Sequence, residues 1–357
     1  MRKWTICALA VLALLGSVMT ASAQELTEAL PPEAQELLDG LEEENAVDGG
    51  LGAGLARLWE KGCESFLDIL RQSLRGVVLL LGAVLVCGVA EDCLQAAGSE
   101  VNYVSMAGAL VVTALTAGSV RGLMTLGMET IEQLDVFSKA LLPTLAAAVA
   151  AGGGAVTAGT GQVIAVCFAD ALITLIRGLL LPMTYFLAAA ATADAMLPRH
   201  GLGTVAKAAS RVVTWLLTGS LVLFTGYLTL SGAVSTSADA LTVQVARSAV
   251  GAMPVVGRIL SDAAGSVLAG AGVVKNAIGV FGLLGVLAAC LGPFVRLGVQ
   301  YLLYKLTAFL AGMTAAPELA KLIDALGGVF GLMLGMTGSC ALLLLISISS
   351  AILVVTP

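Results

Sequence analysis

Two ionisable residues interrupt a long apolar run near the middle of the chain. Asp170 and Arg177 lie within residues 162–190, seven positions apart. Seven residues are nearly two turns of an α-helix, so both side chains would share one face, about 10 Å apart along the axis. That separation is long for an ion pair but suits a polar surface in contact with water or a partner. Ionisable groups inside a membrane are candidate functional groups, and a structural polar contact within a complex is the alternative.

Glycine-rich stretches at 146–161 and 263–274 form a second group of candidates. No Lys-Ser or Lys-Thr follows the glycines, so a phosphate-binding loop is excluded. Glycine allows tight turns and close backbone approach, but bent backbone must be shielded from lipid. We therefore expect a re-entrant hairpin or a tightly packed helix. The candidate hairpin or packing residues are Pro143, Gly152, Gly153, Gly154, Gly159 and Gly161, with Pro254, Gly265, Gly270 and Gly272 in the second stretch.

The two stretches predict an internal tandem repeat. An offset of 111 residues aligns Pro143 with Pro254 and Pro182 with Pro293, with shared glycines between them. The copies would cover about 101–200 and 212–311, and Pro182 and Pro293 would each break a long span. Duplication of this kind is common in transport proteins of membranes. Two true spans in each copy would make the copies parallel and three would make them inverted, and the pattern leaves both arrangements open.

No catalytic constellation accompanies these residues. The chain has a single histidine, His200, whereas a zinc protease motif needs two with a glutamate. No serine lies in a nucleophile elbow. The sequence therefore predicts a protein that is not an enzyme and has no metal or other cofactor. Nucleic acid is also excluded as a partner, because the net charge of −6 comes largely from an acidic segment at 25–45.

The amino-acid composition indicates whether the chain folds in water or in a membrane. Hydrophobic residues make up 58% of the 357 positions, charged residues 12%, and the mean hydropathy is +0.98. Soluble domains carry about a quarter charged residues, so the chain has too few to cover a soluble fold. We expect an all-α, polytopic protein of the cell membrane. Apolar segments fall at about 76–90, 103–120, 141–160, 162–190, 212–232, 276–295, 297–316 and 327–355.

The N-terminal part is expected to differ from this membrane domain, residues 76–357. Residues 1–23 combine a basic start, a short apolar run and Ala21-Ser22-Ala23, which is typical of a signal peptide, with an uncleaved anchor as the alternative. Residues 24–75 form an acidic and amphipathic extracytoplasmic segment, and 55–75 has helical periodicity. Basic residues at 191–211 place that loop in the cytoplasm, which requires that 141–160 does not cross the membrane.

Residues 210–312 contain specific sequence stretches in addition to their apolar composition. The stretches STSADALTVQVARSAVG, MPVVGRILSDA, VVKNAIG and QYLLYKLTA resemble the stage III sporulation protein AE family of endospore-forming bacteria. The resemblance implies a subunit of the mother-cell membrane around the forespore, in a channel or feeding apparatus needed for late forespore gene expression. Its partners would be other membrane subunits of that complex and the lipid bilayer, and a homo-oligomer stays open. The resemblance assigns no catalytic residue.

Two other hypotheses follow from the residues. A stand-alone secondary transporter would use the duplicated hairpin-containing core, with substrate near Asp170 and Arg177. A scaffold would instead dock partners through the amphipathic helix at 55–75, with the charged residues serving as structural contacts.

Overall fold

The computed structural model describes residues 46–96, 103–151, 155–196, 202–251, 257–313 and 317–353. These residues are helical apart from a turn at 312–313, and none of them forms a strand. The helices are α3 (Ala46–Ala96), α4 (Tyr103–Ala151), α5 (Ala155–Leu175), the π-helix η1 (Ile176–Leu180), α6 (Leu181–Met196), α7 (Leu202–Gly251), α8 (Gly257–Ala311) and α9 (Pro317–Leu353). The signal peptide predicted for 1–23 lies outside the described residues, as do Gly152, Gly153, Gly154 and Pro254.

The expected all-α membrane class is confirmed. Six helical stretches of the described residues are long and apolar enough to cross a membrane. They are Gly54–Cys93, Met106–Ala151, Ile164–Met196, Leu202–Leu230, Gly272–Ala311 and Pro317–Ile352. Each is longer than the ~20 residues that span the hydrocarbon layer.

The helices do not end where the predicted apolar segments end. The amphipathic segment 55–75 and the apolar segment 76–90 belong to one helix, α3. The segments 276–295 and 297–316 are joined through Arg296, which lies inside α8. Charged residues end an apolar run, but Arg, Lys and Glu are good helix formers, so the helix continues through them.

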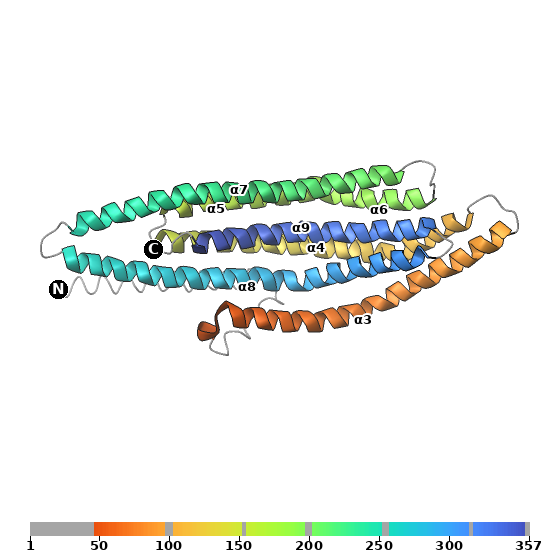
Figure 1. Ribbon diagram of the computed structural model, residues 1–357, viewed down its shortest axis with the longest axis horizontal. Helices are drawn as coiled ribbons and strands as arrows, with labels where there is room; N and C mark the ends of the chain where they lie inside the picture. The colour runs from red at the N-terminus through yellow and green to blue at the C-terminus, as the bar shows by residue number, and fades with distance from the viewer. Residues whose placement is uncertain are drawn as a thin grey trace.

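The helices run side by side along one long axis (Figure 1). Helix α9 lies at the centre and contacts α4, α5, α6, α7 and α8. Helices α5, η1 and α6 follow one another as a single rod beside α7, whereas α3 lies at the edge of the bundle against α8 and α4. The central position of α9 fits its sequence, which has no charged residue after Asp324.

The core is made by apolar side chains that meet around α9. Phe137 and Met124 of α4, Leu297 of α8, and Phe330 and Met336 of α9 are fully buried in one cluster. A bilayer gives apolar helices little reason to associate, so contact between well-fitted side chains must hold such a bundle together. This packing fixes the positions of α4 and of the α5–η1–α6 rod, which carry the predicted polar face.

The two glycine-rich stretches have different local structures. In the first, α4 runs through Pro143 and ends at Ala151, α5 begins at Ala155, and the two helices pack against each other. Gly159 and Gly161 follow inside α5.

In the second stretch, Gly265, Gly270 and Gly272 lie inside the uninterrupted helix α8. A hairpin there is a wrong prediction, because these glycines continue a helix rather than turn it. A side-chain carbon at Gly270 or Gly272 would meet no atom within 4 Å, so these two glycines also allow no close helix contact. The internal repeat itself stays a prediction.

The two prolines also differ in their surroundings. Pro182 is the second residue of α6 and lies two positions after the end of the π-helix η1. Pro293 lies inside α8 and does not end that helix, so the predicted break of the second span is absent. A bent but continuous helix is one of the known responses to an internal proline.

Candidate functional site: a charged belt on α4, α5 and η1

The predicted polar face consists of Asp170 on α5 and Arg177 on η1, and both residues are exposed. Arg177 pairs with a residue that the sequence analysis missed. Its Nη2 atom lies 2.9 Å from Oε1 of Glu132 on α4, and the two side chains are 46% and 54% exposed. Arg177 is therefore compensated by the neighbouring helix and not by Asp170.

The local backbone explains how Arg177 is presented. In η1 the helix widens by one residue, and the N–H of Leu181 donates to the carbonyl of Ile176. Pro182 has no N–H to donate to the carbonyl four residues earlier, so a regular α-helical turn would leave that carbonyl without its donor. π-turns of this kind are frequent at functional positions of helices. The residue types that cause this turn place Arg177 beside α4.

Helix α4 carries a second ion pair close to the first. Nζ of Lys139 lies 2.8 Å from Oδ2 of Asp135, one helical turn away. The Asp135 side chain is only 16% exposed, and its Oδ1 atom is buried with no hydrogen-bond partner. Asp135 borders a small void together with Ser138 of the same helix and Cys340 of α9. A buried carboxylate oxygen without a hydrogen-bond donor costs free energy. Asp135 therefore lowers the stability of the folded bundle.

These five charged residues form what we call the charged belt: Glu132, Asp135 and Lys139 of α4, Asp170 of α5 and Arg177 of η1. The belt separates two uncharged stretches of α4, residues 103–120 and 140–151. Helix α4 has 49 residues, which corresponds to a length of about 73 Å. The hydrocarbon layer is ~30 Å thick. The whole helix therefore exceeds one bilayer, and the belt marks a polar level along it.

The composition of the belt indicates what it can do chemically. Among the described residues no group of three or more His, Cys, Asp or Glu side chains is placed to hold a metal ion. The belt contains three carboxylates and two cations, with two of the carboxylates already paired. Such an arrangement can hold helices in register, contact a partner or line a polar path.

The ion-pair partner of Arg177 could not be inferred from the sequence of its own helix. The spacing of Asp170 and Arg177 predicted a shared face, but the partner of Arg177 comes from a helix 45 positions earlier in the chain. One available signal was the charged stretch between residues 121 and 139, which separates two apolar segments and had no role in the sequence analysis.

Comparison with known proteins gives a consistent picture. The family model described as Stage III sporulation protein AE matches residues 43–356. Stage III sporulation protein AE of Bacillus subtilis (strain 168) is 25% identical to the chain over 215 residues, which is 60% of this chain and 53% of that protein. The chain thus matches about half the length of this curated relative. No solved structure matches the chain.

Proposed function

The chain belongs to the stage III sporulation protein AE family, and on that basis we propose that it is a multi-pass subunit of the channel complex between mother cell and forespore. The resemblance seen in residues 210–312 is thereby confirmed. The protein has a role in sporulation and carries membrane helices. The proposal adds the finer statements: a place in the mother-cell membrane around the forespore, a role in late forespore gene expression, and membrane subunits of the same complex as partners.

The observation that carries the proposal is the family match over nearly the whole described bundle. Two structural features support it. The charged belt ties α4 to η1 through the ion pair of Glu132 with Arg177, which is a contact suited to holding helices of a membrane subunit in register. Helix α3 also exposes large apolar side chains, with Trp59 76% and Val78 64% exposed. Exposed aromatic and apolar faces of this kind are suited to lipid or to other subunits.

A clean deletion in a sporulating host tests the proposed role. We expect engulfment to proceed normally, a late forespore reporter to remain silent and heat-resistant spores to be lost. Complementation with the wild-type gene should restore all three readouts. Normal numbers of heat-resistant spores from the deletion strain would refute the proposal.

A pull-down from sporulating cells tests complex membership separately. Crosslinkers placed at exposed positions of α3, such as Trp59 and Val78, should capture other membrane proteins that are made during sporulation. Capture of only a second copy of this chain would support a homo-oligomer and count against the heteromeric complex.

A stand-alone secondary transporter is the second candidate. The observation that favours it is the π-turn with Arg177, Glu132 and Asp170 in the middle of a helical rod, because transporters place substrates beside irregular helix segments. Purified protein in liposomes should then move a small solute without other subunits. If Asp170→Asn and Arg177→Gln leave that flux unchanged, the charged belt is not its substrate site.

A further inference from the structure

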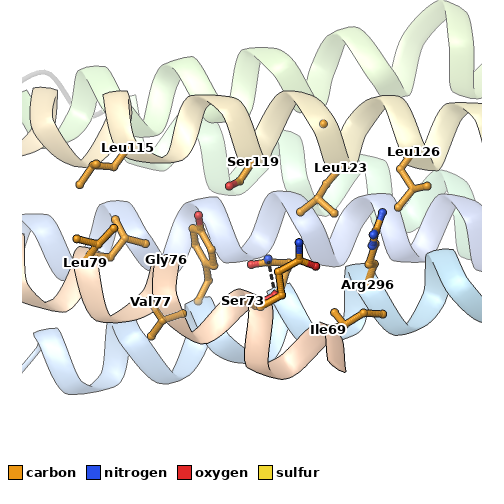
Figure 2. A pocket seen from close by; sticks show the side chains of 15 residues that line it. Ile69, Ser73, Gly76, Val77, Leu79, Leu115, Ser119, Leu123, Leu126 and Arg296 are labelled. Carbon is orange, nitrogen blue, oxygen red and sulfur yellow. Dashed lines mark hydrogen bonds between the residues drawn. The ribbon is translucent and has the colours of Figure 1, made fainter. Parts of the chain in front are cut away.

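A groove with a volume of about 470 Å³ lies between α3, α4 and α8, and none of the five belt residues lines it (Figure 2). Volumes between about 300 and 1,000 Å³ are usual for small-molecule sites. Glycines open the groove: a side-chain carbon at Gly76 of α3 or Gly122 of α4 would meet no atom within 4 Å. The groove is therefore open because α3 and α4 each carry a glycine, and no larger side chain, at these two positions.

The groove is apolar at one end and has a positively charged side chain at the other. One end is lined by the apolar side chains of Leu79 and Leu115, which come from the uncharged stretches 76–90 and 103–120. The other end is lined by Ile69, Leu126 and Arg296. Figure 2 shows Arg296 rising from α8 towards α4 beside Leu126, at the opposite end from Leu79 and Leu115. Leu126 is followed on α4 by the charged residues from Glu129 onward, so the Arg296 end lies at the polar level of the bundle.

Arg296 has no ion-pair partner among the described residues. It lies within the apolar stretch Gly272–Ala311 of α8. The next basic residue of that helix, Lys305, pairs with Asp324 of α9 at 2.6 Å. A cation inside a membrane helix is normally compensated by an anion or by polar contacts. The guanidinium of Arg296 instead faces the groove, where no carboxylate contributes to the lining.

Polar groups line the middle of the groove and are partly occupied with one another. Nε2 of Gln300 donates to Oγ of Ser73 at 3.0 Å, which ties α8 to α3. Ser119 of α4 and Tyr304 of α8 line the same part of the groove. Gln300 lies one helical turn after Arg296, so its amide and the guanidinium line the same side of the groove.

We propose that this groove binds an anionic phospholipid, with the phosphate on Arg296 and an acyl chain along Gly76, Leu79 and Leu115. An arginine side chain presents a planar fork of N–H donors that matches a phosphate group in two-point contact. Basic pockets between membrane helices are suited to lipid headgroups. A free phosphate ion would satisfy the guanidinium but would leave the apolar end of the groove empty. Only a lipid supplies both chemistries in one molecule.

The test uses the full chain, purified in mild detergent, with native mass spectrometry and thermal stability as readouts. The probes are phosphatidylglycerol, phosphatidylcholine and inorganic phosphate. We expect phosphatidylglycerol to remain bound and to raise the unfolding temperature, and the other two to do neither. Equal binding of phosphatidylcholine, or full protection by inorganic phosphate alone, would overturn the proposal.

Two variants address the two ends of the groove. Arg296→Gln removes the charge and should weaken phosphatidylglycerol binding roughly tenfold or more, and Arg296→Lys should retain part of the affinity. Gly122→Leu should fill the groove without a clash and abolish binding. The matched control is Gly118→Leu on the same helix, where the added side chain also meets open space but lies outside the groove. Wild-type affinity in Arg296→Gln or in Gly122→Leu would contradict the proposal.

Discussion

Helix α8 makes two interfaces, one with α9 and one with α3, in which glycines have different surroundings. Towards α9, a side-chain carbon at Gly327 would lie 3.1 Å from Cβ of Tyr304, and one at Gly331 would lie 3.0 Å from the ring of Tyr301. Towards α3, the effect depends on position: a carbon at Gly54 would lie 2.8 Å from the Leu284 side chain of α8, whereas one at Gly76 would meet nothing within 4 Å. Glycine thus brings α8 and α9 close together, whereas on the α3 side it leaves open space beside Gly76, where the groove lies.

The two sides of α8 are therefore suited to different roles: the packed α9 side stabilises the fold, and the open space beside α3 can bind another molecule. Helix association in lipid depends on close packing, because the hydrocarbon tails already solvate apolar side chains. The α8–α9 interface provides that packing and lies in the main core. The α3 side leaves space that a lipid, a ligand or a partner can occupy without disturbing the core. We therefore expect substitutions at the α9 side of α8 to cost more stability than substitutions beside the groove on the α3 side.

The largest expected effect is that of Gly327→Leu. The new side chain would meet Cβ of Tyr304 and the backbone N of Lys305 at 3.6 Å, neither of which can move away without moving α8. Overpacking of this kind costs about 1–3 kcal/mol or more. Thermal unfolding in detergent measures it, with Gly118→Leu as the control, because that position is open and should change stability by less than ~0.5 kcal/mol. Equal losses in both variants would mean that close packing at Gly327 adds no cost beyond that of a leucine at an open position.

Lys275→Met should have the next largest effect. Lys275 is only 2% exposed, and its Nζ atom donates to the carbonyl of Ile352 at 2.7 Å, near the end of α9. The last carbonyls of a helix lack partners within the helix and attract cations. Loss of this donor should cost about 1–3 kcal/mol.

Hydrogen exchange is the sharper measurement for Lys275→Met. It should show the last turn of α9 exchanging faster while α3 is unchanged. The control is Lys321→Met, since Lys321 is exposed and pairs with Glu318 of its own helix. Faster exchange in α3 rather than α9 would contradict the assignment of Lys275 to the α8–α9 interface.

These expectations could be made only in part from the sequence. Composition and periodicity were enough for the helical membrane class and for the helix at 55–75. They placed boundaries at charged residues such as Arg296, although a helix with good formers continues through a single charge. The partner of Arg177 was out of reach because Glu132 lies on another helix, and spacing along one helix gives no information about a neighbour. The groove was hidden for the same reason, since it needs three helices.

Ser73→Ala probes the open interface and should have a modest effect. The hydrogen bond from Gln300 to Ser73 joins α8 to α3 across the groove. A typical intramolecular hydrogen bond contributes about 0.5–1.5 kcal/mol net, and water can replace one at an open groove. We expect a loss at or below the lower end of that range in denaturant unfolding. A loss larger than that of Lys275→Met would reverse the order of the two interfaces.

The smallest effect is expected for the ion pair between Lys305 and Asp324, at the end of the α8–α9 interface. The Nζ and Oδ1 atoms lie 2.6 Å apart, but the side chains are 35% and 56% exposed. Exposed pairs contribute about 0.2–1 kcal/mol, and salt weakens them. A double-mutant cycle with Lys305→Met and Asp324→Asn, run at low and high salt, measures the coupling. A small coupling that fades with salt places this end of the bundle in water and leaves glycine packing as the main source of α8–α9 stability. A coupling well above that range and insensitive to salt would mean that charge, and not only close packing, holds the interface together.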